Sequence, residues 1–416
     1  MNLPETYQVA YIDFDSFFAS VEEQEDPKLH GKPVGVVPIE YDKPTSLIAV
    51  NKVAKQKGVR GLMSVREAKK RCPSLVLVSQ KPHLYEKYHQ ELLALIEQEV
   101  PIETVCSIDE VSCRLDSADK KAPKQLANRI KNRIRDKIGP YVTCSIGFAS
   151  NNQLAKIASE MDKPDGITLL HPQKLPGRLL DLTLDDIPGV GRNMRTRLNL
   201  AGIGSVADLW NSQPKQLRKV WGNVNGERFW YALHGYEVRA QSTKRSMFGH
   251  GRVLPPDWRD FDHAFECARF LTTKAAWRLR RSGFLAKRYN LWLRLMDGRW
   301  AGEFPLDAIN DNQAAIAALQ ALWFQARKDL PSSSEVKHLH VAFSSLVSMS
   351  EDDQYTMIAP DQERKKRWNN ACAALDDLNR RYSKTIISMG PLTPPPGGYA
   401  GGKIAFSRVP DMEDFW

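Results

Sequence analysis

The sequence lacks the features that mark membrane and secreted proteins. None of its apolar runs approaches the ~18 residues that a membrane-spanning helix requires, so we expect no contact with a membrane. Residues 1–6 lack the basic and then apolar pattern of a signal peptide. The six cysteines are scattered without Cys-x-x-Cys spacing, which indicates neither a disulfide framework nor a structural zinc site. Together these absences predict a cytoplasmic protein with reduced, mostly buried thiols.

Acidic residues are scarce in one part of the chain. Over all 416 residues, 59 Lys and Arg stand against 49 Asp and Glu, which gives a net charge of +10. Residues 239–300 alone contain 14 basic and 5 acidic residues, so nearly the whole excess lies there. A concentrated basic segment is typical of a protein that binds nucleic acid, and a solvated basic surface is the alternative. The length of the chain predicts about two to four domains.

Two carboxylates lie where the first predicted strand ends. The apolar residues 9–12 predict a buried strand, and Ser16 is a candidate cap for a helix that runs to residue 24. Asp13 and Asp15 therefore fall in a strand–helix turn, which can hold a carboxylate still and leave it hydrated. Taken alone, two solvated acids in a turn are the commoner arrangement.

A second acidic pair, Asp109 and Glu110, lies in another apolar segment, residues 105–115, which we predict to be one strand. Adjacent side chains of a regular strand point to opposite faces, so we predict a bend, bulge or turn that lets both carboxylates reach one ion. With Asp13, the pair supplies three carboxylates at two strand ends. Such a group suits two Mg²⁺ ions, which bind oxygen ligands and stabilise the attacking and leaving oxygens of phosphoryl or nucleotidyl transfer.

Helices and strands alternate up to residue 170, which predicts an α/β layer with the acids at strand ends. Beyond it, residues 184–191 followed by a basic helix, 192–200, resemble a helix–hairpin–helix motif. In such a motif the turn at Gly189 and Gly191 frees backbone N–H groups that, with the helix beginning at Arg192, hold a DNA phosphate. A tight turn of another kind is the alternative.

The basic segment opens the last predicted domain. Residues 239–246 are polar and aperiodic, which indicates a linker, and residues 247–343 predict a β-α-β-β-α-β unit. On the strand 287–296, one face predicts the core, with Tyr289, Leu291, Leu293 and Leu295. On the other face, basic and flat side chains alternate as in a sheet that binds nucleic acid, and packing at a sheet edge is the alternative for Trp292. The candidate DNA-binding residues of this strand are Arg288, Trp292 and Arg294.

The segment from residue 347 differs in composition. It predicts one helix, 361–382, followed by a proline-rich spacer near residues 391–398 and an acidic, aromatic end at residues 409–416. That end is either an anchor for a partner or a disordered terminus.

Three motifs in this order resemble those of the Y-family translesion DNA polymerases: residues 11–22 (YIDFDSFFASVE), 107–110 (SIDE) and 157–166 (IASEMDKPDG). The resemblance runs from about residue 7 to residue 346 and implies a multidomain α/β right-hand polymerase with palm, small fingers, helix–hairpin–helix thumb and little finger. The implied domains are a discontinuous palm (1–15 and 82–170), fingers (16–81), thumb (171–238), linker (239–246), little finger (247–346) and a C-terminal tail for partner contacts (347–416).

The resemblance also implies roles for single residues. Asp13, Asp109 and Glu110 would hold the two catalytic Mg²⁺ ions, and the carbonyl group of Phe14 would complete one coordination shell. Asp15 matches an acid that lies near the site in this family but is not one of the core metal ligands. A structural role is therefore at least as good an interpretation of Asp15 as a catalytic one.

The same resemblance assigns a group of residues to the nucleotide. Phe17 and Phe18 would lie at the nucleotide, where Phe18 would exclude a 2′-hydroxyl, with ordinary core packing as its alternative. Lys163 would reach the triphosphate, with a solvated turn lysine as the alternative.

The fingers and the tail resemble one branch of the family more than the others. Ala49, Lys52 and Lys55 stand where many members carry Thr, Tyr and Arg, and the first and last match the UmuC-like branch. Lys55 would contact phosphate, and the role of Lys52 stays open. Residues 375–382 also resemble the UmuC-like tail. Where that branch carries a sliding-clamp peptide, this chain has a divergent candidate or a plain loop, with Gln354, Met357 and Ile358.

We therefore expect template-directed, low-fidelity DNA synthesis past damaged bases, in a DNA repair or SOS-type response at the nucleoid. The expected partners are primer–template DNA and deoxynucleoside triphosphates, with a sliding clamp and a recombinase filament or accessory subunit as further candidates. The alternative is a catalytically silent, polymerase-like DNA-binding adaptor subunit, for which the three intact carboxylates would have no use. An unrelated helix–hairpin–helix DNA-binding protein would leave them unexplained as well.

Overall fold

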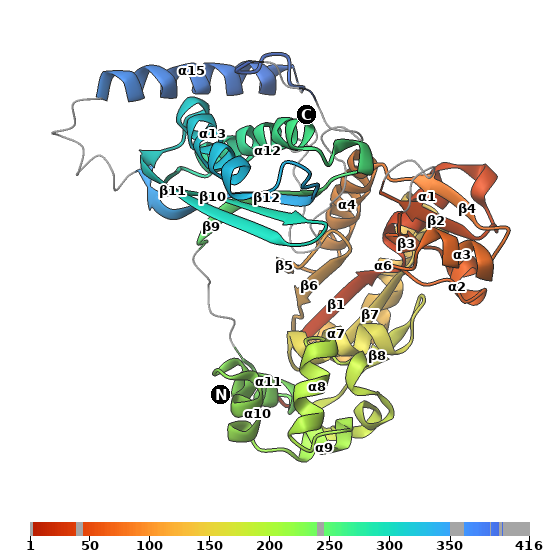
Figure 1. Ribbon diagram of the computed structural model, residues 1–416. Coiled ribbons are helices and arrows are strands. Elements are labelled where there is room, and N and C mark those ends of the chain that lie inside the picture. The colour runs from red at the N-terminus through yellow and green to blue at the C-terminus, as the bar shows by residue number, and fades with distance from the viewer. Residues whose placement is uncertain are drawn as a thin grey trace. The chain divides into compact units, whose positions relative to one another are not determined.

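The structure is a computed structural model, and the residues that it describes are 3–38, 45–238, 245–349, 362–382, 384–390 and 393 (Figure 1). The chain separates into two compact units, with the division between Gln241 and Ser242, inside the predicted linker. Within the described ranges, no helix is long and apolar enough to cross a membrane. The candidate clamp residues Gln354, Met357 and Ile358 lie outside these ranges.

A five-stranded sheet forms the palm in the first unit. Its strands are β1 (Val9–Phe14), β5 (Ile102–Val105), β6 (Glu110–Arg114), β7 (Cys144–Ala149) and β8 (Ile167–Leu169). They lie in the order β5-β6-β1-β7-β8, so β1 is central (Figure 1). β1 pairs antiparallel with β6 and β7, and every residue of β1 is buried. This central strand therefore carries Asp13 into the interior of the sheet.

The predicted single strand 105–115 is wrong, because the chain folds there into a hairpin. β5 ends at Val105, residues 106–109 form the turn, and β6 begins at Glu110. The N–H groups of Cys106 and Ser107 both donate to the carbonyl oxygen of Glu110 (2.9 and 3.2 Å), which closes the turn. The distortion that we predicted at Asp109 and Glu110 is confirmed, and it takes the form of a tight reversal.

The helices α4 (Pro82–Glu97), α6 (Pro123–Lys137) and α7 (Asn152–Met161) pack beside this sheet, and the short α5 is Ser117–Lys121. α7 contacts both β1 and β7. Gly147 of β7 allows a very close approach, since a Cβ atom there would lie 2.1 Å from the carbonyl oxygen of Ala155 and 2.3 Å from the amide nitrogen of Ser159. A residue without a side chain therefore sets the separation between α7 and the sheet.

The fingers contain a small three-stranded sheet with the order β3-β2-β4. Its strands are β2 (Val34–Val37), β3 (Ala49–Val50) and β4 (Val76–Ser79), and its helices are α1 (Phe17–Glu25), α2 (Lys52–Gln56) and α3 (Val65–Arg71). Ser64 caps α3, because its hydroxyl accepts a bond from the N–H of Glu67 (3.2 Å). Ser16 occupies the predicted cap position of α1, but its side chain does not cap the helix. Ser16 has a φ of +52° and no capping side-chain bond, because the chain must turn sharply between β1 and α1.

Four helices form the thumb: α8 (Arg192–Leu200), α9 (Val206–Asn211), α10 (Pro214–Trp221) and α11 (Asn225–Leu233). Their apolar faces share one core with α7 and β1 of the palm. Gly226 allows α11 to cross close to α10, where a Cβ atom would lie 2.2 Å from the carbonyl oxygen of Leu217. The described residues also contain short 3₁₀ helices: η1 (Pro27–Leu29), η2 (Pro172–Lys174), η3 (Gly177–Asp181), η4 (Leu184–Asp186) and η5 (Pro256–Trp258).

The second unit contains the predicted β-α-β-β-α-β arrangement. Its elements are β9 (Met247–Val253), α12 (Phe261–Arg281), β10 (Phe284–Leu295), β11 (Arg299–Ile309), α13 (Asn312–Asp329) and β12 (Val336–Ser348). The antiparallel sheet has the order β11-β10-β12-β9, and α12 and α13 cover one face of it (Figure 1). The predicted core face of β10 is confirmed, since all four of its apolar side chains are buried in the core beneath the helices. β12 extends to Ser348, beyond the predicted end of the unit at residue 343.

The helix predicted at residues 361–382 is α15 (Gln362–Arg381), and it packs on the second unit. Asp376 forms a bidentate ion pair with Arg280 of α12, with oxygen–nitrogen distances of 2.7 and 2.9 Å. Arg280 also donates to the carbonyl oxygen of Asn310 (2.7 Å) and the side chain of Asn312 (2.9 Å). Cys372 is fully buried at the same contact. This part of the predicted tail is therefore anchored by a largely buried charge pair.

We expect that Asp376→Ala loosens α15, because it leaves the buried Arg280 without its carboxylate partner. A lost charge-assisted hydrogen bond raises the rate of local opening by about tenfold or more, which amide hydrogen exchange over residues 362–382 measures. Asp377→Ala in the same helix is the matched control, because its pairs with Arg380 and Arg381 are exposed and longer than 3.5 Å. Equal exchange rates in the two variants would show that the Arg280 pair does not hold the helix.

Candidate active site

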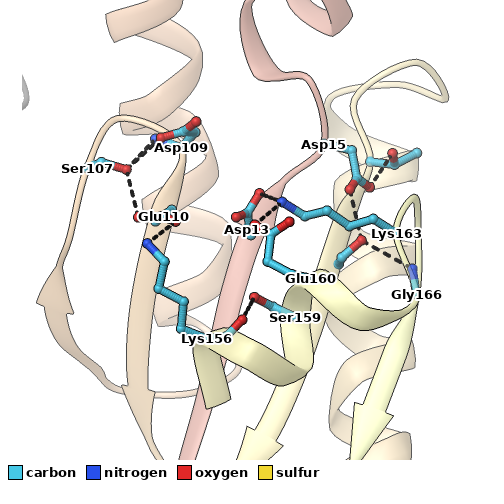
Figure 2. A network of polar contacts seen from close by, with 12 residues as sticks. Asp13, Asp15, Ser107, Asp109, Glu110, Lys156, Ser159, Glu160, Lys163 and Gly166 are labelled. Atoms are coloured by element: carbon cyan, nitrogen blue, oxygen red, sulfur yellow. Dashed lines mark hydrogen bonds and ion pairs between the residues drawn. The ribbon is translucent and has the colours of Figure 1, made fainter. Parts of the chain in front are cut away.

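The site is assembled by the pairing of β1 with β6. Their antiparallel register places Asp13 directly opposite Glu110. The N–H of Phe14 donates to the carbonyl oxygen of Asp109 (2.8 Å), which fixes the end of the hairpin turn against β1. Figure 2 shows Asp13 and Glu110 on adjacent strands, with Asp109 on the turn that precedes Glu110. The structure thus brings the three predicted metal ligands to one end of the sheet.

Asp13 lies in a strongly perturbed environment. Asp13 is only 5% exposed, and burial raises the pKa of its carboxyl group to about 8. The positive charge of Lys163 lowers this pKa and so opposes the effect of burial. The ammonium group of Lys163 lies 2.7 Å from Asp13 and 2.6 Å from Glu160, so one cation bridges two acids (Figure 2). Although burial opposes it, these two acids raise the pKa of Lys163. The lysine predicted to reach a triphosphate is here the counter-ion of Asp13.

The second pair of acids has its own partners. The hydroxyl of Ser107 lies 2.5 Å from a carboxylate oxygen of Asp109 and 3.4 Å from one of Glu110 (Figure 2). Lys156 of α7 forms an ion pair of 2.5 Å with Glu110. Burial and the neighbouring Glu110 raise the pKa of Asp109. Two lysines from α7 and the turn after it therefore neutralise carboxylates of the two strands.

The donor set fits a hard divalent cation. One carboxylate oxygen each from Asp13, Glu110 and Glu160 lie within 4.8 Å of one another, and Asp109 lies on the neighbouring turn. Oxygen ligands of this kind suit Mg²⁺, which takes one or two carboxylates and completes its shell with water and substrate phosphate. The residues present could therefore hold such an ion, once the lysines release them.

Asp15 has a structural role. Its carboxylate accepts bonds from the hydroxyls of Thr143 (2.9 Å) and Ser145 (2.8 Å) and from the N–H of Asp165 (2.8 Å). These neutral donors join β7 and the turn after α7 to the start of α1. Asp15, two residues after the candidate metal ligand Asp13, therefore holds in place the turn that carries Lys163.

A pocket of about 250 Å³ opens between fingers and palm. Its lining combines the predicted nucleotide residues with a predicted metal ligand: Ser16, Phe17, Phe18, Ile48, Ala49, Val50, Lys55, Gly61 and Asp109. Both phenylalanines are nearly buried, and the ring of Phe18 stacks on Tyr85 with centroids 4.4 Å apart. Lys52 is exposed and does not line the pocket. The structure brings Phe17, Phe18 and Lys55 together with Asp109.

The predicted phosphate contact of the thumb has the expected backbone. Gly189 has a φ of +95°, which side chains other than glycine rarely adopt, and Gly191 is the cap position of α8. Arg192 begins the helix and is exposed. The N-terminus of α8 thus presents free backbone N–H groups beside a cation.

The predicted DNA-facing side of β10, within the second unit, is solvent-accessible. Arg294 is exposed, and Trp292 is 37% exposed with its ring 5.2 Å from that of His340. Arg288 is also exposed but pairs with Glu303 of β11 (2.8 Å). The alternative of edge packing does not apply to Trp292, because β10 lies between β11 and β12.

Sequence reasoning missed the partners of the acids. It gave no role to Lys156 or to Glu160, although they are four residues apart and hence on one face of the helix 152–161. That spacing could have indicated Lys156 and Glu160 as partners of the acids, and Ser107 within the second motif could have indicated a third partner. The residue behind Phe18, Tyr85, had no signal of its own, because only the packing of α4 on α1 brings it there.

Comparison with known proteins decides the family. The impB/mucB/samB family matches residues 12–160, its C-terminal domain matches residues 245–357, and the thumb domain of DNA polymerase iota matches residues 185–237. DNA polymerase IV of Actinobacillus pleuropneumoniae is 30% identical over 280 residues, covering 66% of this chain and 77% of the relative. This chain belongs to the Y-family of DNA polymerases.

Further relatives of this Y-family polymerase carry the same name. DNA polymerase IV of Moorella thermoacetica is 29% identical over 393 residues, covering 91% of this chain and 94% of the relative. A solved Y-family polymerase chimera of Dbh and Dpo4 is 24% identical with a TM-score of 0.67, covering 82% of this chain and 99% of that one. The predicted family, fold class and polymerase activity are confirmed. These relatives give the UmuC-like placement no support.

The two buried aspartates should respond in opposite ways to the same substitution. Asp15→Asn places an amide N–H₂ group against donors, and we expect it to lower the stability of the palm by about 1–3 kcal/mol. Above about pH 8, where Asp13 is charged, Asp13→Asn removes a buried charge that the metal-free fold accommodates poorly, and we expect a higher melting temperature. Scanning calorimetry of both variants in a chelating buffer measures the difference.

The pH dependence of that difference follows from the pKa of Asp13. Its folded pKa, about 8, lies above the ordinary value of 3.8, so stability falls as the pH rises through this window. Asn at position 13 has no such loss. We therefore expect the advantage of Asp13→Asn to grow by about 1 kcal/mol or more between about pH 6 and about pH 9. An advantage that shrinks with rising pH would contradict the burial of this carboxyl.

Proposed function

We propose that this Y-family polymerase extends a primer by two-metal nucleotidyl transfer, with Asp13, Asp109 and Glu110 as the metal-binding carboxylates. The observation that carries the proposal is the β1–β6 register, which sets Asp13 opposite Glu110 and bonds the turn at Asp109 to Phe14. Two divalent ions, when bound, would supply charge stabilisation for the attacking 3′-hydroxyl and the leaving pyrophosphate. The carbonyl group of Phe14, at the end of the same strand, is the proposed backbone ligand.

The lysines give this site a resting state. Lys163 pairs with Asp13, and Lys156 pairs with Glu110, so each of these two carboxylates has a cationic partner before substrates arrive. Lys163 is also paired with Glu160, and its side chain is 25% exposed. An incoming triphosphate offers it an alternative anion. We propose that Lys163 transfers from Asp13 to the triphosphate, which leaves the Asp13 oxygens available.

The pocket between fingers and palm is the proposed nucleotide site. Phe17 and Phe18 would support the sugar, with Phe18 excluding a 2′-hydroxyl, and Lys55 would contact phosphate. Both phenylalanines and Asp109 line this one pocket, which places the proposed sugar contact beside a proposed metal ligand.

The proposed DNA contacts lie in each unit separately. In the thumb, the turn at Gly189 and Gly191 and the helix beginning at Arg192 would hold a backbone phosphate. In the little finger, Trp292 and Arg294 present an exposed flat ring and a cation, a combination suited to backbone and base contact. Arg288 would join them after release from Glu303.

The finer biological setting remains part of the proposal. We propose low-fidelity synthesis past damaged template bases, in a DNA repair or SOS-type response, in the cytoplasm at the nucleoid. The proposed substrates are primer–template DNA and deoxynucleoside triphosphates. We further propose two kinds of partner: a sliding clamp, and a recombinase filament or accessory subunit. The clamp would contact residues near Gln354, Met357 and Ile358. A relationship to the UmuC-like branch is also a proposal. The intact carboxylates speak against a silent adaptor subunit.

Replacement of a proposed metal ligand should abolish catalysis without unfolding the palm. We expect Asp109→Ala to lower primer extension with Mg²⁺ by at least about a hundredfold, because it removes a proposed ligand of the ions that stabilise the attacking and leaving oxygens. Glu103→Ala is the control, since Glu103 is an exposed acid on the neighbouring strand β5. Extension that is equal in Asp109→Ala and Glu103→Ala would refute the assigned role.

The proposed sugar contact has its own test. Phe18→Ala should raise ribonucleotide incorporation relative to deoxyribonucleotide incorporation by about tenfold or more, because the ring no longer blocks the 2′-hydroxyl. The ratio of kcat/KM values for the two nucleotides measures it. Phe148→Leu, a core change in β7, should leave the ratio unchanged. An unaltered ratio in Phe18→Ala would return Phe18 to plain core packing.

A further inference from the structure

Two helices hold the ring of Phe18 from behind. Phe18 and Glu22 lie one turn apart on α1, and Lys81 and Tyr85 are likewise four residues apart at the start of α4. The ring of Tyr85 lies flat against that of Phe18, with 4.4 Å between centroids and an interplanar angle of 13°. Phe18 lines the nucleotide pocket, whereas Tyr85 is not among the lining residues. Tyr85 therefore supports Phe18 on the side away from the pocket.

Glu22 fixes this support in place. It is fully buried and accepts a bond from the hydroxyl of Tyr85 (2.7 Å), while Lys81 pairs with its second oxygen (2.5 Å). Burial and the neighbouring Glu22 raise the pKa of Tyr85 far above its ordinary value, so the phenol remains a donor. A buried carboxylate that loses a donor carries a large penalty, and this penalty resists any shift of the Tyr85 ring.

We propose that Glu22 and Tyr85 are positioning residues that set the sugar selectivity of this polymerase by holding the Phe18 ring at a fixed depth in the pocket. The inference rests on the proposed role of Phe18 and deepens it. A ring that excludes one hydroxyl must be fixed to a fraction of an ångström, because a small retreat opens room for the 2′-oxygen. The stack on Tyr85, itself bonded to a buried charge, supplies that rigidity.

The chain offers a matched control one turn further along both helices. The hydroxyl of Tyr88 on α4 donates to Glu25 on α1, also at 2.7 Å. Tyr88 is buried and does not line the pocket, as is also true of Tyr85. The difference is that its partner, Glu25, lies two turns from Phe18 on α1. Tyr88→Phe thus removes the same kind of bond between the same two helices, away from the sugar contact.

The test compares Tyr85→Phe with Tyr88→Phe in the full chain. Incorporation of a deoxyribonucleotide and the matching ribonucleotide is measured on one primer–template, and selectivity is the ratio of their kcat/KM values. We expect Tyr85→Phe to lower this ratio about fivefold and Tyr85→Leu to lower it further, because the ring support is then lost as well. Tyr88→Phe should stay within about twofold of the wild type. The fraction of active enzyme cancels in the ratio, so partial misfolding does not imitate the effect.

The double variant Phe18→Ala with Tyr85→Phe separates positioning from direct contact. If Tyr85 acts through Phe18, the second substitution adds nothing to the loss of selectivity that Phe18→Ala causes alone. Additive losses, an unchanged ratio in Tyr85→Phe, or equal losses in Tyr85→Phe and Tyr88→Phe would each overturn the inference while the sugar role of Phe18 stands. An unchanged ratio in Phe18→Ala itself would instead overturn that role and the inference with it.

Discussion

The pairing of β1 with β6 is the interaction on which the site depends. β1 is the central strand of the palm, and its ladder with β6 determines that Asp13 faces Glu110. A shift of one residue would turn Asp13 to the opposite face of the sheet and separate the acids. The bond from Phe14 to Asp109 adds the last rung beyond the strand end. Every residue of β1 is buried, so a change of register would disturb packing on both faces of the strand.

Asp13, Asp109 and Glu110 bring several acids to one sheet end, and nearby positive charge offsets part of their negative charge. α7 and the turn after it provide this charge through Lys156 and Lys163, each within 2.7 Å of an acid on a strand. Charge compensation from a single helix allows the same segment to neutralise the empty site and to receive an anionic substrate. Asp15, which is equally buried, needs no cation because three neutral donors satisfy it.

Sequence reasoning located the acids but not their surroundings. Asp13 was predictable because an apolar run ends there, and Asp109 with Glu110 demanded a break in any strand. The hairpin between β5 and β6 was not predictable, since residues 105–115 alternate like a single strand and the turn is imposed by pairing with β1. Tyr85 and Glu22 meet through packing of helices whose sequences are about sixty residues apart, which no local pattern encodes. Helix α15 was predicted as a helix, but its docking through Arg280 was not.

One glycine governs the geometry of the charge balance. At Gly147 the backbone of α7 nearly touches β7, so any side chain there would lift the helix from the sheet. Lys156 and Glu160 both belong to α7, and Lys163 lies in the turn that follows the helix. A single helix–sheet spacing therefore tunes all of these charges together. The positions of the charged groups in the site therefore depend on how closely α7 packs on the sheet, which the missing side chain of Gly147 allows.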